Sequence, residues 1–155
     1  MGVHKEGQEG GVPALEEVLT EAEALMERAH ERLEAASLLL REGMLADAVS
    51  RAYYAAFNAA KAVLLLLGSR PRTHEGLRSE FALRVVRAGL ADRRLGRILS
   101  KLAEAREEGD YSPVFLLDEG EVRELVDSAR EFVSAMEDLL SRLRESAPGP
   151  APPRP

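Results

Sequence analysis

Apolar residues recur every three or four positions along most of the chain, which is the period of an α-helix. The pattern predicts a helix between Pro13 and Glu42 and an alanine-rich helix from about Leu45 to Leu67. A shorter helix is expected near His74 to Ala88, a fourth from Asp92 to about Glu108, and a last one after residue 120. No segment alternates with the period of a strand for long. The sequence therefore predicts an all-α fold, an up-and-down antiparallel bundle of four to five helices.

Glycines mark where these helices are expected to end. Gly43, Gly68 and Gly89 each follow an apolar periodic segment, at the place where a helix commonly ends on a left-handed residue. Gly109 is expected to open a connection that continues to Gly120.

Two segments match a capping box. In this pattern the side chains of the N-cap residue and of the third helical residue each accept a hydrogen bond from the other's backbone amide. Asp118-Glu119-Gly120-Glu121 is expected to begin the last helix. Thr20-Glu21-Ala22-Glu23 also matches, which predicts a break or restart near Thr20. The last helix carries apolar residues at alternating spacings of three and four, a pattern typical of a bundle core. They are Val122, Leu125, Ala129, Phe132, Met136, Leu139 and Leu143.

The two ends of the chain differ in composition from its middle. Residues 1–11 are polar and glycine-rich and are expected to form a flexible tail, and residues 145–155 form a proline-rich tail that is expected to be disordered. Residues 12–144 remain for the bundle. The chain has 155 residues, 45% of them hydrophobic, which suffices for one core.

Composition excludes several classes of site. The chain contains no cysteine, so it can form no disulfide, zinc–thiolate site or cysteine nucleophile. Its longest apolar run, Ala62 to Leu67, is far shorter than a membrane span, and no membrane partner is expected. The start MGVHKEGQEGG lacks an apolar run behind its lysine, so no secretory signal is expected and a cytoplasmic location is predicted.

Charge is distributed unevenly along the chain. The net charge is −6, yet Arg70 to Arg106 contains ten basic and four acidic residues, a net +6 that leaves −12 elsewhere. A basic segment in an acidic protein can form a local positive surface that attracts nucleic acid. The alternative is that these arginines only solvate two outer helices, and the sequence leaves both interpretations open.

Histidine is the only candidate for acid–base chemistry near neutral pH. His4 lies in the tail and His30 among acids on the first helix, and no two histidines have the spacing of metal ligands, so neither a metal nor a cofactor is expected. His74 lies where a loop enters a helix, beside Arg70 and Arg72. Imidazole and guanidinium together could cleave RNA without a metal, as general base and as phosphate ligand. The alternative is that His74 only helps to begin the helix.

The alanine-rich helix contains two adjacent tyrosines. Tyr53 falls with Val49, Phe57 and Ala60 on the apolar face and is expected in the core. Tyr54 falls on a polar stripe that borders a groove, and this stripe consists of Asp47, Arg51, Tyr54, Asn58 and Lys61. At the end of the fourth helix, Arg106, Asp110 and Tyr111 combine charge with an aromatic ring, although a structural Arg–Asp contact also explains them.

These segments together resemble the HEPN superfamily, in particular its small stand-alone prokaryotic members. The resemblance rests on REGMLADAVSRAYYAAFNAAKAVLLLLG, on RTHEGL followed by Phe81, and on AREEGDY, and it extends from about Leu25 to Leu140. It implies an up-and-down bundle that forms a homodimer. It also implies a minimal nucleotidyltransferase as the partner in a toxin–antitoxin pair. Several HEPN groups are metal-independent ribonucleases that place an Arg-x4–6-His motif at the dimer interface.

This chain departs from that motif. Arg70 precedes His74 with three intervening residues, and Arg72 with one. The first hypothesis is therefore a binding and interaction module that pairs with a nucleotidyltransferase and binds nucleotide or RNA. The alternatives are a metal-independent endoribonuclease and a helical scaffold without a ligand. The candidate catalytic residues are His74 and Arg106. The candidate nucleotide- or phosphate-binding residues are Arg70, Arg72, Arg51, Tyr54, Lys61 and Tyr111.

Overall fold

The computed structural model describes residues 14–146, which form helices and connections and contain no strand. The predicted all-α fold is confirmed. The elements are α2 (Leu15–Arg41), α3 (Leu45–Leu66), α4 (His74–Phe81), the π-helical turn η1 (Ala82–Val86), α5 (Arg93–Tyr111) and α6 (Glu119–Ser146). The expected tails fall outside the described residues, except that α6 continues through Glu145 and Ser146.

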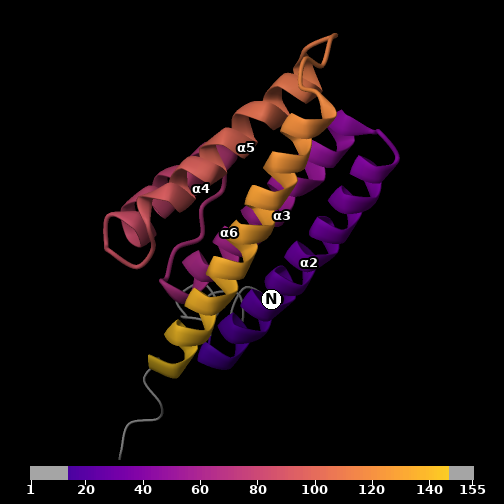
Figure 1. The fold of residues 1–155 in the computed structure, drawn as a ribbon. Coiled ribbons are helices and arrows are strands. Elements are labelled where there is room, and N and C mark those ends of the chain that lie inside the picture. The colour runs from indigo at the N-terminus through magenta and orange to yellow at the C-terminus, as the bar shows by residue number, and fades with distance from the viewer. Residues whose placement is uncertain (1–13, 147–155) are drawn as a thin grey trace, which may run out of the picture.

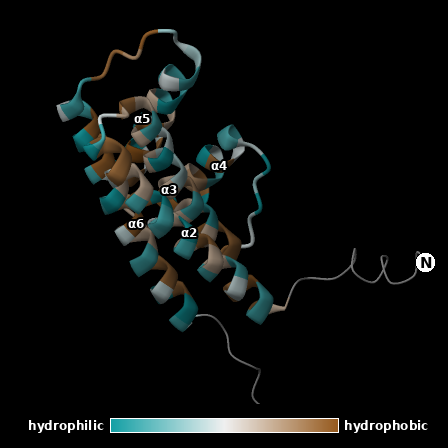
Figure 2. Cartoon of the chain, turned by 90° about the vertical axis from the view of Figure 1, so that its right-hand side faces the viewer, coloured by the Kyte–Doolittle hydropathy of each residue, from teal (hydrophilic) through white to brown (hydrophobic). Residues whose placement is uncertain are grey.

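The long helices α2, α3, α5 and α6 run up and down in a bundle, and the shorter α4 with η1 lies against α3 and α5 on one side (Figure 1). Arg144 near the end of α6 pairs with Glu23 near the start of α2, with 2.8 Å between Nη1 and Oε2. The two helices are therefore antiparallel neighbours. Hydrophilic (teal) and hydrophobic (brown) positions alternate along the helices in Figure 2, as expected of amphipathic helices in a bundle.

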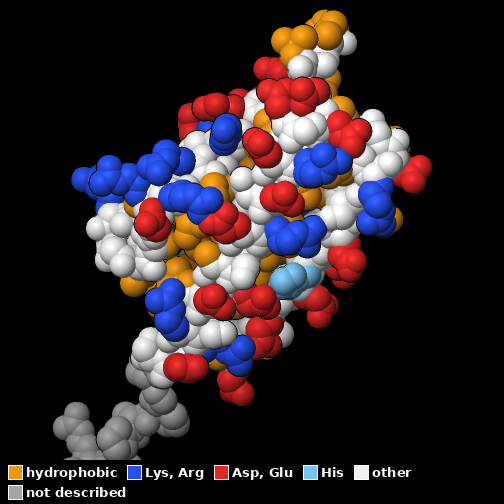
Figure 3. Space-filling model, viewed as in Figure 1, with side chains coloured by type: hydrophobic (Ala, Val, Ile, Leu, Met, Phe, Trp, Pro, Cys, Tyr) orange, Lys and Arg blue, Asp and Glu red, His pale blue; other side chains and the backbone are white. Residues whose placement is uncertain are grey.

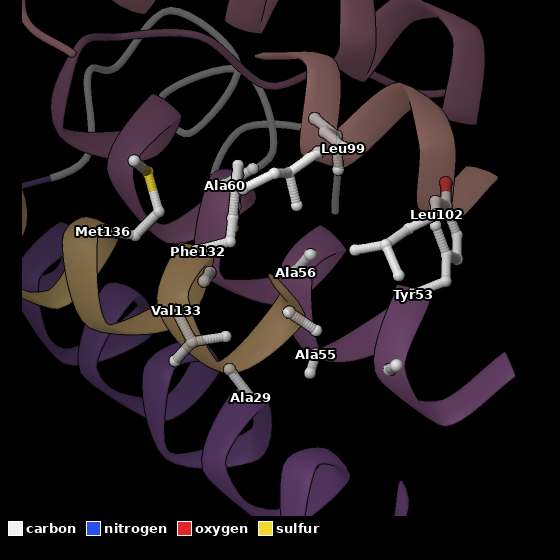
Figure 4. Close-up of a cluster of buried hydrophobic side chains, with 14 of the residues drawn as sticks. Ala29, Tyr53, Ala55, Ala56, Ala60, Leu99, Leu102, Phe132, Val133 and Met136 are labelled. Carbon is white, nitrogen blue, oxygen red and sulfur yellow. The ribbon is translucent and has the colours of Figure 1, made fainter. Parts of the chain in front are cut away.

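Helix α3 is the centre of the fold because α2, α4, α5 and α6 all pack on it. Its inner surface consists mostly of alanines with no exposed area: Ala48, Ala52, Ala55, Ala56, Ala59, Ala60 and Ala62. Methyl groups allow neighbouring backbones to approach closely, and Figure 4 shows Ala55 and Ala56 among side chains of α2 and α6. Larger side chains from the surrounding helices, such as Phe132, Met136 and Leu99, fill the remaining space.

The predicted helix ends at three glycines are confirmed. Gly43, Gly68 and Gly89 have φ angles of 76°, 82° and 81°, the left-handed region in which glycine avoids the cost of a Cβ. The start of α6 has the predicted capping box. The Asp118 amide donates to Glu121 Oε1 at 2.9 Å, and the Glu121 amide donates to Asp118 Oδ1 at 2.8 Å.

The break predicted near Thr20 is wrong, because α2 is continuous from Leu15 to Arg41. The Thr20 hydroxyl donates to the carbonyl of Glu16 at 2.9 Å, a bond within the helix that does not interrupt it. The helix instead begins one turn earlier, where the Ala14 amide donates to the Glu17 carboxylate at 3.3 Å.

The connection predicted from Gly109 begins later than expected, since α5 continues to Tyr111. Gly109 stays helical, and a Cβ there would lie 3.3 Å from the ring of Phe115. Its role is therefore to let the following connection fold back against the helix, and not to end it. The predicted single helix from His74 to Ala88 is divided, because its second half widens into η1.

The predicted apolar stripe of α6 is buried along its length, with Leu143 half-buried at the end. Phe132 from this stripe meets Phe81 of α4 with 5.3 Å between ring centroids. The stripe therefore belongs to the bundle core. Within residues 14–146, every helix is too short or too polar to reach across a bilayer.

Candidate functional site

Five side chains from three helices meet at one place on the side of the bundle, and we call this group the histidine cluster. It consists of Tyr53, Tyr54 and Phe57 from α3, His74 from the start of α4, and Arg106 from α5. Tyr53 is fully buried, whereas the other four are half-buried. The cluster thus extends from the core to the surface.

A hydrogen bond connects the buried Tyr53 with the half-buried His74. The Tyr53 hydroxyl lies 2.7 Å from Nδ1 of His74, and the two rings are nearly parallel with 5.6 Å between centroids. The bond fixes the orientation of the imidazole and leaves Nε2 as its other polar atom. Tyr53 was predicted in the core, and its burial is confirmed, but its hydroxyl also holds the histidine.

Tyr54 and Phe57 complete an aromatic wall around the imidazole. The Phe57 centroid lies 4.7 Å from that of His74, and the Tyr54 ring meets it edge-on at 5.8 Å. The adjacent tyrosines also contact each other in a T-shaped pair at 5.2 Å. The half-exposed rings therefore present aromatic surface beside a polar, titratable group.

Arg106, on α5, lies over the rings of both tyrosines. Its guanidinium carbon lies 4.9 Å from the Tyr53 centroid and 5.6 Å from the Tyr54 centroid, distances at which a cation is attracted to a ring face. Nη1 donates to Asp110 Oδ2 at 2.9 Å, and the arginine side chain is only 14% exposed. Its Nε is buried and has no hydrogen-bond partner within residues 14–146. The structural Arg–Asp contact considered from the sequence is therefore present.

Thr73 positions His74 as the first residue of α4. The Thr73 hydroxyl accepts from the Gly76 amide at 2.8 Å and caps the helix. A Cβ on Gly76 would lie 2.9 Å from that hydroxyl, so the glycine leaves room for the cap. The interpretation in which Thr73 and His74 begin a helix is thus realised, and the same geometry directs the imidazole at Tyr53.

The electrostatics of the cluster keep the imidazole neutral. Burial lowers the pKa of His74 below its ordinary value of 6.5, and the positive charges of Arg106 and Arg78 lower it further. Burial raises the pKa of the Tyr53 phenol, against the opposing effect of the same two arginines. Near pH 7 the pair therefore consists of a neutral imidazole and a neutral phenol.

Other predicted phosphate ligands lie away from the cluster. Arg70 forms two hydrogen bonds to the carboxylate of Glu21 on α2, at 2.9 and 3.2 Å. Its guanidinium and the charge of Lys61 both lower the pKa of Glu21, so Lys61 belongs to this second group. Lys61 lies about two turns of α3 from Tyr53.

Arg51, Arg72 and Tyr111 are exposed and also lie outside the histidine cluster. Tyr111, with 78% of its surface exposed, ends α5 beside the apolar connection seen in Figure 2. Of the eight predicted site residues, the structure therefore brings together His74, Arg106 and Tyr54.

Sequence reasoning missed three contributors. Tyr53 and Phe57 were assigned to the core alone, and Arg78 was counted only as a basic residue. Arg78 lies four positions after His74, on the same face of α4, and this spacing was the available signal. The hydroxyl of Tyr53 gave no signal, because a helical pattern places a ring on a face without showing where its polar end points.

Comparison with known proteins defines the family to which this fold belongs. Residues 22–139 match the HEPN domain family, so the chain belongs to the HEPN family. A protein of Methanocaldococcus jannaschii named "Putative toxin" is 35% identical, over 82% of this chain and 94% of the relative. A UPF0332 protein of Thermotoga maritima is 34% identical, over 77% of this chain and 90% of the relative. A UPF0332 protein of Pyrococcus horikoshii is 43% identical over 54% of this chain and 59% of the relative.

Proposed function

We propose that this chain is a HEPN binding module with a toxin-like role, which binds a nucleotide or an RNA strand at the histidine cluster. The observation that carries the proposal is the meeting of half-exposed Tyr54 and Phe57 with His74 and Arg106. Aromatic faces stack on bases, and imidazole and guanidinium groups bind phosphate.

A phosphate that binds Arg106 has to compete with Asp110. Asp110 already occupies one edge of its guanidinium, so a phosphate on that edge would replace the carboxylate. The exchange conserves a charge-assisted hydrogen bond and releases Asp110 to solvent, where it is already partly exposed. Because this exchange is reversible and changes no covalent bond, it suits a module that binds and releases its ligand.

Ligand binding is tested by NMR titration with uridine monophosphate, observing the two histidine rings that lie in the described residues. The His74 signals are expected to shift, whereas those of His30, which lies on α2 and pairs with Glu137 of α6, act as an internal control. Replacing Tyr54 with alanine removes a stacking surface worth about 1–3 kcal/mol, so affinity should fall roughly 5- to 150-fold. Equal shifts of both rings, or no shift, would refute the proposal.

The proposal also includes a homodimer and a nucleotidyltransferase as the partner protein. Two relatives from Methanocaldococcus jannaschii are named "Putative toxin", and the HEPN resemblance implies a homodimer and a minimal nucleotidyltransferase partner. Light scattering of the purified chain tests the dimer. Co-expression with a nucleotidyltransferase encoded beside it tests the partner, with a stable complex on gel filtration as the expected result.

A second candidate function is metal-independent cleavage of RNA, and the lowered pKa of His74 favours it. A neutral imidazole near pH 7 is able to accept the proton of a ribose 2′-hydroxyl, while Arg106 stabilises the charge on the phosphate. Incubation of labelled RNA with the protein in EDTA provides the test. Replacing His74 with alanine should reduce cleavage about 100-fold or more if the imidazole is the general base. Cleavage that survives this substitution would refute the role.

A further inference from the structure

A groove with basic walls lies between α4 with η1 on one side and α5 on the other, and we call it the basic groove. It has a volume of about 550 Å³. Its charged walls are Arg78 from α4 and Arg93, Arg97 and Lys101 from α5, and its apolar lining includes Ala82 and Val86 of η1. Figure 3 shows basic side chains gathered over α4 and α5 beside exposed apolar surface.

The four cations of the basic groove are available to a ligand. Within residues 14–146, none of them has a carboxylate oxygen within the distance of an ion pair, whereas neighbouring Arg84 and Arg94 pair with Glu80 and Glu131. Four cations against one lining carboxylate, that of Glu104, leave the groove with a net positive charge, even though the whole chain is acidic. Of the two interpretations of the basic middle segment, this geometry favours the positive surface.

Three of the four cations are arranged in a row. Arg93, Arg97 and Lys101 follow each other at intervals of four residues on one face of α5, which separates them by about 6 Å along the helix axis. This interval is comparable to the separation of successive phosphates along an extended nucleic-acid strand. The row begins at the N-terminus of α5, where the helix dipole adds to the positive potential.

We propose that the basic groove binds the phosphate backbone of a single RNA strand and leads it to the histidine cluster. Arg78 connects the two places, because it lines the groove and lies one helical turn from His74. This deepens the proposed function, on which the RNA identity of the strand rests. Glu104 also lines the groove, between Lys101 and Arg106 of the histidine cluster, so the strand passes one carboxylate before it reaches the cluster.

The lining of the groove favours a single strand over other anionic partners. A lipid surface or a duplex offers phosphates to the cations but has no unpaired bases to place on the apolar lining at Ala82 and Val86. A single strand can place bases on that lining and phosphates against the row of arginines. The lining is formed by a π-helical turn, an element that often occurs at functional sites.

Fluorescence anisotropy with a short labelled oligouridylate, measured over a range of salt concentrations, tests the proposal. The double variant Arg93→Gln and Arg97→Gln should bind more weakly. Its plot of log affinity against log salt should be flatter by about 1.4, since each lost phosphate contact in a single strand contributes about 0.7. The matched control is Arg28→Gln with Arg32→Gln, which removes the same charge at the same spacing from α2. The control should leave the slope unchanged.

The outcomes separate this proposal from the binding function. If both double variants lose affinity equally, net charge explains the binding and the basic groove is refuted as a site. The groove is refuted as well if the wild-type chain does not bind the strand, or if the variant loses binding to phosphatidylserine vesicles but not to RNA. Uridine monophosphate should still shift the His74 signals in the Arg93→Gln, Arg97→Gln variant, so the histidine cluster is tested independently.

Discussion

The hydroxyl of Tyr53 lies 2.7 Å from Nδ1 of His74, and this bond joins the buried centre of α3 to the first residue of α4. Residues 67–73 connect these two helices, so the bond holds the start of α4 against α3 on the far side of this connection. The histidine cluster therefore also anchors the fold, and its contribution to stability is measurable without knowledge of the ligand.

Replacement of Tyr53 by phenylalanine should lower the free energy of unfolding by about 1 kcal/mol, because a half-buried imidazole nitrogen loses its partner. Tyr54→Phe is the matched control, since the Tyr54 hydroxyl has no hydrogen-bond partner within the described part of the chain. Urea denaturation of both variants measures the difference. Equal losses would show that the Tyr53–His74 bond adds nothing.

The stability of the protein should decrease as pH falls below neutrality, because protonation of His74 is disfavoured in the folded state. Burial and the neighbouring Arg106 and Arg78 lower the pKa of His74 below 6.5. The unfolded chain therefore binds more protons between the two pKa values, and stability is lost as pH falls from about 6.5 through the folded pKa. In His74→Gln this part of the pH dependence should disappear. Urea denaturation at several pH values measures it.

Removal of the Arg78 charge should raise the pKa of His74, because that charge opposes protonation of the imidazole. An NMR titration of the His74 ring in Arg78→Gln measures the change directly. Arg72→Gln is the control, since Arg72 lies only two positions from His74, closer than Arg78, but is exposed and is not among the charges that lower the pKa of His74. The prediction fails if both variants titrate like the wild type.

Arg106→Ala should destabilise the protein by about 2 kcal/mol, since it removes a largely buried charge-assisted hydrogen bond and the contact with two tyrosine rings. Arg123→Ala provides the comparison, because Arg123 forms an equally spaced pair with Glu119 but is exposed. An exposed pair of this kind contributes below about 0.5 kcal/mol. Thermal denaturation of the two variants should therefore give clearly different results.

Thr73→Ala should cost about 1 kcal/mol through loss of the N-cap of α4, whereas Thr73→Ser should retain the hydroxyl and most of the stability. Because the cap orients the first turn that carries His74, the alanine variant should also weaken nucleotide binding. If alanine and serine behave alike, the Thr73–Gly76 bond does not position the helix.

Helical periodicity and glycine placement were sufficient to predict most of the bundle, because both act locally. Gly43, Gly68 and Gly89 end helices where expected, since a left-handed residue is a requirement of its own turn. The prediction for Gly109 was wrong, because a glycine at this position makes room for the ring of Phe115, six residues later, and does not end the helix. The widening at η1 likewise depends on packing and has no local signature.

The candidate site was predicted only in part, because its geometry depends on contacts between helices. His74, Arg106 and Tyr54 were selected by residue type and position, and the structure brings them together. Arg70 was selected because it is near His74 in sequence, yet it turns to Glu21 on another helix. Nearness along a loop does not determine direction, so the choice among several arginines required the tertiary structure.

The alanines of α3 have a consequence for engineering of the site. A methyl group has a single arrangement, so the spacing between α3 and its neighbours does not depend on which rotamers the core side chains adopt. The backbone beneath Tyr53 is thus held at a separation set by van der Waals contacts of these methyl groups with the neighbouring helices. Residues at the rim, such as Tyr54 and Phe57, can then be exchanged to alter ligand preference while the helix that carries them keeps its position.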